Sequence, residues 1–247
     1  MRRYPKKLCA PIKTFAKYAE LNSILQKVVQ QTQSHEYFDS LVSSRGQYRF
    51  SDKFYEDHPE AVTDSGSGNM VVSNAFDALS HVFIGKKSDN SDTIAFIGRT
   101  QNARQIRYIQ REYIIPNDYI DAYKVMMAEA NGTGQFGETL SQPMISSPGE
   151  GATDTFISIG PFATKEEASH ALSYVKTKFA RALLGVNKAT QHNPRSVWKS
   201  IPLQDFTSTS DIDWSAPIKA IDQQLYKKYG LSDEEIRFIE THVKEMA

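Results

Sequence analysis

Short β-forming runs occupy only the middle of the chain, and segments with helical spacing lie on both sides of them. Each run is the length of one strand, and polar turns separate the runs. The predicted strands are residues 82–84, 93–97, 105–109, 124–130 and 155–159. Because strands and helices do not alternate one by one, the pattern favours an α+β (mixed α/β) fold: a twisted central sheet, packed helices and a helical C-terminal tail.

The clearest helical pattern begins at Thr164, where Glu167 three residues later predicts a capping box. Apolar residues then recur at helical spacing, which predicts one long helix ending at Gly185. Ser232 and Glu235 predict a second capping box. Further helices are expected at residues 15–33, 37–42, 215–229 and 232–243. Polar residues 51–70 predict a long loop, and residues 98–103 predict a hairpin connection.

Composition supports a folded protein without a membrane span. The 247 residues are 40% hydrophobic and 23% charged, which is enough to build a substantial core. Lys13 and Lys17 interrupt any apolar leader, and no apolar run is long enough to cross a bilayer. The single cysteine, Cys9, excludes an internal disulfide and a cysteine-rich zinc site in this chain. We therefore expect a cytoplasmic protein.

Charge is balanced overall but segregated along the chain. Residues 1–17 and 176–199 carry basic residues and no acid, whereas the segment from Asp205 onward has nine acids and five bases. Segregated basic surfaces suit a polyanion such as DNA. Ordinary charge clusters on solvated faces are the alternative explanation.

Two groups of basic and amide side chains are candidates for DNA contacts. Arg181 is expected on the helix face opposite the apolar stripe, where its guanidinium could reach a phosphate. Residues 187–195 form a loop whose side chains could hydrogen-bond base edges, and residues 51–69 are a second candidate for groove contact. Phosphate contacts are predicted for Arg99, Arg104, Arg107, Lys176, Lys178, Arg181 and Lys188, and base contacts for Asn187, Gln191, His192 and Arg195.

Catalytic motifs are largely missing. The sequence contains no Walker loop, no dinucleotide fingerprint and no nucleophile elbow. The six histidines show no metalloprotease spacing, so no metal ligands are predicted. The enzyme alternative is a small Mg²⁺-dependent nuclease built on Asp118, Asp121 and Lys124, although a solvated turn before a strand explains these residues better.

Several motifs occur in an order that points to one family. These motifs are residues 41–45, 123–125, 130–132, 157–162, 165–168, 174–179, 190–192, 201–206, 221–231, 234–236 and 238–240. Together they resemble the C-terminal region of adenine-specific DNA methyltransferases of type II restriction-modification systems, the kind in which one chain can combine methylation and cleavage. The resemblance covers about residues 20–247.

In that family, this region is the target-recognition domain, and a separate domain carries an Asn-Pro-Pro-Tyr type motif and binds S-adenosylmethionine. Neither catalytic motif is present here; the only Asn-Pro pair is Asn193-Pro194. The resemblance therefore implies double-stranded DNA recognition without catalysis or a cofactor in this chain. The catalytic methyltransferase or nuclease domain, with its S-adenosylmethionine, is expected in the same or another chain.

The expected organisation is a helical segment (1–45), a DNA-recognition domain (46–205) and an acidic helical segment (206–247). A third hypothesis makes the chain a protein-docking subunit that binds a methyltransferase through those acidic helices.

Overall fold

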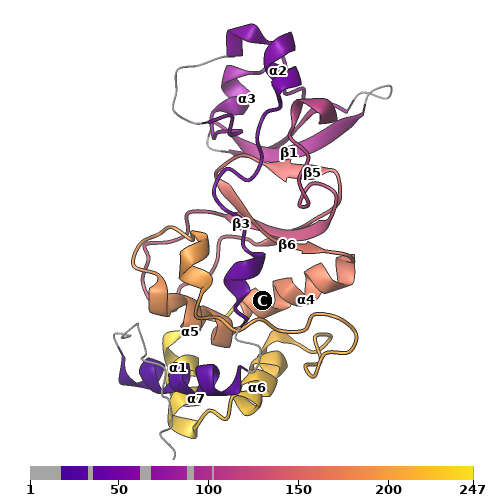
Figure 1. Ribbon diagram of the computed structural model, residues 1–247. Coiled ribbons are helices and arrows are strands. Elements are labelled where there is room, and N and C mark those ends of the chain that lie inside the picture. The colour runs from indigo at the N-terminus through magenta and orange to yellow at the C-terminus, as the bar shows by residue number, and fades with distance from the viewer. Residues whose placement is uncertain (1–17, 33–35, 62–67, 88–91, 102, 247) are drawn as a thin grey trace, which may run out of the picture.

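The computed structural model of the protein describes residues 18–32, 36–61, 68–87, 92–101 and 103–246. The basic residues 1–17, with Cys9, lie outside this range. Two three-stranded sheets and a set of helices form an α+β fold, as predicted. Figure 1 shows the layers: a small sheet with short helices at the top, a second sheet in the middle, and the longer helices below it.

The upper sheet has the strand order β2-β1-β5. β1 (Thr93–Thr100) and β2 (Ala103–Gln110) form the predicted antiparallel hairpin, and β5 (Glu150–Ala152) pairs with β1 in parallel. The short helices α2 (Asp52–Asp57) and α3 (Ala75–Ala78) lie on this sheet (Figure 1). Their buried phenylalanines, Phe54 and Phe76, share an upper core with Phe96 of β1.

The lower sheet is built around β3 (Tyr123–Ala128), which pairs antiparallel with β4 (Met144–Ser146) and β6 (Phe156–Phe162). Successive residues of β3 face different cores, because side chains alternate along a strand. Met126 belongs to the upper core, and its neighbours Val125 and Met127 belong to the lower core. A strand covered on both faces explains why this stretch is continuously apolar rather than alternating.

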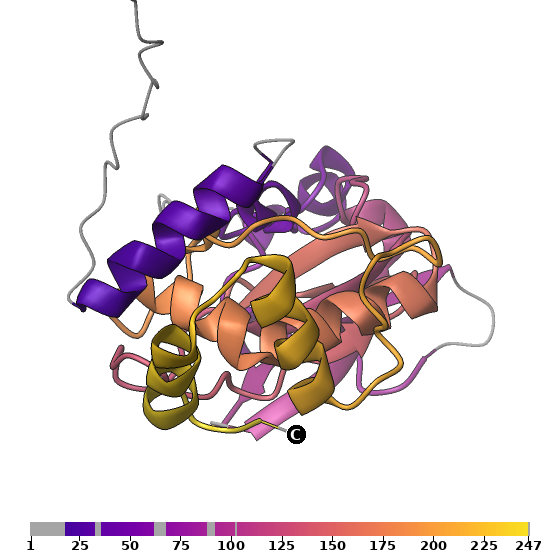
Figure 2. The same ribbon diagram turned by 90° about the horizontal axis from the view of Figure 1, so that it is seen from below.

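The longer helices cover the lower face of the second sheet, as Figure 2 shows from below. They share the lower core with β3 and β6. These helices are α1 (Ala19–Gln31), α4 (Lys165–Lys176), α5 (Lys178–Asn187), α6 (Ile218–Lys228) and α7 (Asp233–His242). Helices from both chain ends therefore pack in the same core as the central segment. No helix in the described ranges is long and apolar enough to cross a membrane.

The single long helix predicted after Thr164 is wrong, because Thr177 divides it into α4 and α5. The Thr177 hydroxyl donates to Tyr174 O (2.7 Å) and accepts from the amide of Ala180 (3.1 Å), which ends one helix and caps the next. Ser232 and Glu235 form the predicted capping box. At Thr164 only half of the box exists, since the Glu167 carboxylate accepts from Ala163 N instead.

Two other predictions are wrong in the upper layer. The segment beginning at residue 51 is not a long loop, because the Ser51 hydroxyl caps α2 and Phe54 anchors that helix in the core; residues 62–67 lie outside the described ranges. Residues 82–84 are not a strand, since only Ile84 bridges to β2, at Tyr108. The 3₁₀ helices are η1 (Phe38–Leu41), η2 (Pro59–Ala61), η3 (Arg111–Tyr113) and η4 (Arg195–Trp198).

Candidate nucleic-acid interface

A cavity of about 490 Å³ opens where the end of the β1–β2 hairpin meets the ends of the lower strands. Residues far apart in the sequence line it, and three of them, Arg99, Arg104 and His192, belong to the DNA-contact set predicted from the sequence. Its lining residues are Arg45, Ser73, Arg99, Arg104, Ala128, Glu129, Ala130, Ser141, Gln142, Asp154, Thr155, Phe156 and His192. We call this cavity the basic cleft.

One wall of the basic cleft comes from the hairpin. Arg99 of β1 and Arg104 of β2 are cross-strand partners, so both side chains leave the same face of the sheet. The guanidinium carbon of Arg104 lies 5.2 Å from the centre of the Phe156 ring, a cation–π contact that links the two sheets. The hairpin register therefore places two positive charges side by side at the cleft.

The opposite wall comes from the loop after α5, which is docked on the end of β3. The amide of Asn131 donates to Gln191 O and the amide of Asn193 donates to Glu129 O, both at 2.7 Å. These bonds flank His192, which forms a bridge with Ala130. The His192 ring nitrogen Nδ1 then lies 2.6 Å from the Glu129 carboxylate. The loop is thus held by its backbone.

Arg45 is a cleft residue that the sequence prediction missed. Its exposed guanidinium donates to the buried carboxylate of Asp154, with Nη2 2.8 Å from Oδ2. This hydrogen bond, supported by the charge of Asp154, raises the pKa of Arg45 above its ordinary value. The other carboxylate oxygen, Oδ1, is buried and has no hydrogen-bond partner in the described part of the chain. The one sequence feature that could have pointed to Arg45 is the motif 41–45, which carried part of the family resemblance.

The prediction that Arg181 lies on an exposed helix face, free to reach a phosphate, is wrong. Its side chain is 3% exposed and donates to three backbone carbonyls, Lys176 O at 3.2 Å, Glu138 O at 3.3 Å and Lys244 O at 2.5 Å. Burial lowers the pKa of Arg181 to about 10, against the opposing effect of nearby Asp222. Arg181 ties α5 to a loop and to the C-terminal segment.

Most other predicted contacts lie outside the basic cleft. Lys178 pairs with Glu240 (2.6 Å), Asn187 donates to Ser200 Oγ (2.7 Å) and Lys188 donates to Asn131 O (3.3 Å). These side chains therefore make contacts within the protein. Lys176 and Arg107 are half-buried. Gln191, in the loop after α5, and Arg195, at the start of η4, are exposed.

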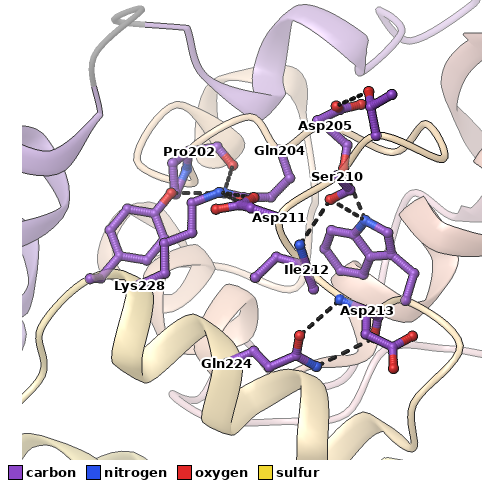
Figure 3. A network of polar contacts seen from close by, with 12 residues as sticks. Pro202, Gln204, Asp205, Ser210, Asp211, Ile212, Asp213, Gln224 and Lys228 are labelled. Atoms are coloured by element: carbon purple, nitrogen blue, oxygen red, sulfur yellow. Dashed lines mark hydrogen bonds and ion pairs between the residues drawn. The ribbon is translucent and has the colours of Figure 1, made fainter.

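Residues 201–206, a motif that carried the resemblance, have a structural role. The buried amide of Gln204 donates to the Tyr229 hydroxyl (2.8 Å), and its oxygen accepts from the Lys228 ammonium (2.9 Å). Figure 3 shows Lys228 also reaching Asp211, at 2.7 Å. A second set of bonds in the same view joins Gln224 to the backbone of Asp213. The network fixes the long segment between η4 and α6 against α6.

The acids of the C-terminal helices are largely committed to internal contacts. Glu235 accepts from Lys27 and Ser23 of α1, at 2.5 and 2.6 Å. Glu240 pairs with Lys178 of α5. These helices therefore use their charge to pack against α1 and α5, which leaves less of it for the docking surface of the third hypothesis.

The position of Lys124 does not support the nuclease alternative. Lys124 is fully buried, and its ammonium donates to Ala122 O (3.1 Å) and Ser147 O (3.0 Å). Burial lowers the pKa of Lys124 to about 8. Asp118 and Asp121 line a separate cavity of about 540 Å³, where Asp121 pairs with Arg111 (2.6 Å). Lys124 is not placed to activate water at that cavity.

Comparisons with known proteins do not assign the chain to a family. No protein-family model matches it, and no curated protein matches it significantly.

Proposed function

We propose that the chain recognises double-stranded DNA as the target-recognition part of an adenine-specific DNA methyltransferase of a type II restriction-modification system. The observation that supports this best is the pairing of Arg99 with Arg104 on one wall of the basic cleft. Like charges directly opposite each other disfavour an antiparallel pair, so two arginines at these positions concentrate positive charge at the cleft rather than strengthening the strand pairing. A phosphate at the cleft could accept paired hydrogen bonds from such guanidinium groups.

The charge of the remaining cleft residues is compatible with this role. Its two acids already face basic partners, since Glu129 contacts His192 and Asp154 contacts Arg45. The charge of Asp154 is therefore compensated within the cleft, and a nearby phosphate meets less repulsion than the bare count of acids suggests.

The size of the basic cleft limits what enters it. A cavity of about 490 Å³ is in the range of small-ligand sites. It accommodates a phosphate with its sugar or one base edge, while the rest of the duplex passes over the outer surface. Gln142 in the cleft and Gln191 beside it could read an adenine, because a glutamine amide can pair with adenine through two hydrogen bonds.

The chemistry belongs to a partner under this proposal. A catalytic methyltransferase or nuclease domain, in the same or another chain, supplies S-adenosylmethionine binding and methyl transfer. This chain supplies the choice of DNA site and needs no cofactor of its own.

The test is binding of the chain to labelled duplex DNA, measured by fluorescence anisotropy over a range of salt concentrations. Each lost phosphate contact should lower the slope of log affinity against log salt by about 0.9. We expect this change for Arg99→Gln and for Arg104→Gln. Arg237→Gln is the matched control, because Arg237 is an exposed arginine on α7, outside the basic cleft.

Two results would contradict the proposal. One is absence of DNA affinity even at low salt. The other is an equal loss of affinity in the cleft variants and in Arg237→Gln. Co-purification with a catalytic partner without DNA affinity would instead favour the docking-subunit hypothesis.

A further inference from the structure

Three potential metal ligands converge at the top of the molecule, away from the basic cleft. His58 ends α2, Glu60 lies in η2, and His81 follows α3. Glu60 Oε1 lies 3.3 Å from His58 Nδ1 and 3.1 Å from His81 Nε2. One ligand atom of each residue lies within 4.8 Å of the others, and the described residues contain no second group of this kind.

The spacing fits a tetrahedral metal centre. Zinc bonds to imidazole nitrogen and carboxylate oxygen are about 2.0–2.2 Å long, so two ligands at the tetrahedral angle stand about 3.3–3.5 Å apart. The two measured separations from Glu60 Oε1, 3.3 and 3.1 Å, are close to this value. Two histidines and one carboxylate also form a donor set that zinc uses when a fourth position stays open.

The protein orients the His58 ring and fixes the backbone beside His81 independently of their contacts with Glu60. The His58 ring packs against Phe54 and Tyr113, with both ring centres 5.3 Å away. His81 directly precedes Val82 and the fully buried Phe83, whose amides donate to Leu79 O. A site with one ligand ring oriented by packing and a second ligand on an anchored backbone loses less conformational freedom when an ion binds than a fully flexible one.

We propose that His58, Glu60 and His81 bind one zinc-like divalent transition-metal ion, with a fourth coordination position for water or a ligand. Both histidines line a cavity of about 360 Å³, which has room for a water molecule or a small ligand beside the ion. The ion joins the α2–η2 segment to the turn after α3. This inference does not depend on DNA binding. The competing explanation is that the two histidines simply hydrogen-bond to Glu60.

The test uses the full chain with ZnSO₄ alone, in competition with a chromophoric chelator, and CoCl₂ alone for spectroscopy. We expect one zinc ion per chain and the visible absorption of tetrahedral cobalt. His81→Ala should lower zinc affinity by at least about 100-fold, because even the loss of a partner that only orients a ligand costs about 10–100-fold. His192→Ala is the matched control: His192 also contacts a glutamate, but the described residues place no third ligand there.

A second variant distinguishes loss of a zinc ligand from loss of folding as the cause of lowered zinc affinity. Glu60 is exposed, so Glu60→Gln should keep the melting temperature of the metal-free protein and still lower zinc affinity. Zinc should raise the melting temperature of the wild type and of His192→Ala, but not of His81→Ala. Failure of the wild type to bind micromolar zinc would overturn the proposal. Equal zinc affinity in the wild type and His81→Ala would also overturn it.

Discussion

Arg99 and Arg104 occupy directly opposite positions on the β1–β2 hairpin, so two guanidinium groups leave the same face of the sheet at the basic cleft. Such a pair works against strand pairing and in favour of an anionic ligand. Removal of one charge should therefore weaken DNA binding more than it weakens the fold.

Arg99→Thr tests this expectation. Threonine has high β-propensity and removes one of two like charges at directly opposite strand positions, so we expect the free energy of unfolding to change by less than about 1 kcal/mol. Affinity for duplex DNA should fall in the same variant. Urea denaturation and anisotropy measure the two quantities. A variant that is destabilised by more than about 1 kcal/mol and binds DNA normally would show that Arg99 serves the fold.

Gln191→Ala should change specificity without changing stability. The Gln191 side chain is exposed, and its backbone carbonyl keeps the bond to the Asn131 amide whatever the side chain is. Thr190 makes the local turn contact, since its hydroxyl accepts from His192 N. Loss of one base contact should cost about 1–3 kcal/mol at one base pair.

The measurement for Gln191→Ala compares a duplex selected from a randomised pool with a scrambled duplex, alongside thermal denaturation. An unchanged ratio of the two affinities would remove the base-contact role.

Arg181→Met should destabilise the protein and leave the DNA affinity of the folded fraction unchanged. The substitution removes the three hydrogen bonds that the buried Arg181 guanidinium donates to backbone carbonyls. Each unsatisfied buried group costs about 1–3 kcal/mol, so the free energy of unfolding should fall by at least about 2 kcal/mol. Urea denaturation measures this loss. A stable Arg181→Met protein with weakened DNA binding would restore the phosphate contact expected from the sequence.

Ionisation of Asp222 should make the free energy of unfolding depend on pH. Burial raises the pKa of this carboxyl to about 6 in the folded state, although it accepts hydrogen bonds from Phe179 N and Lys178 N. Because the folded pKa lies above the ordinary value of 3.8, the contribution to stability is largest below about pH 4. It is lost as the pH rises to about 6, by about 3 kcal/mol in total.

Asp222→Asn is the check, because asparagine cannot ionise. The difference in unfolding free energy between wild type and variant should change across this pH window and stay constant above about pH 7. Chemical denaturation at several pH values measures it. A difference that is constant from pH 4 to pH 7 would contradict the raised pKa.

Local sequence signals predicted much of the fold because the physics that determines those elements is local. The Ser232–Glu235 capping box and the hairpin of β1 and β2 involve neighbours in the chain, and both formed as expected. The break at Thr177 was missed because apolar spacing continues across it, while its hydroxyl satisfies both helix ends.

The candidate site was harder to predict because its residues meet only in the folded chain. Arg181 looked exposed on a helical projection, yet the Glu138 and Lys244 carbonyls come from distant segments and cover it. His58 and Glu60 alone match no metal-binding sequence motif. The third ligand, His81, joins them only in the folded chain. Arg45 is likewise held at the cleft by a hydrogen bond to Asp154, which is more than a hundred residues away in the sequence.

β3 links the two halves of the protein energetically. Its Met126 completes the upper core, while Val125 and Met127 complete the lower one. Neither core can lose this strand without exposing apolar surface in both. The upper layer with its two-histidine cluster and the lower helical layer should therefore unfold in one cooperative transition, and a cavity made at Met126 should lower the melting temperature of the entire chain.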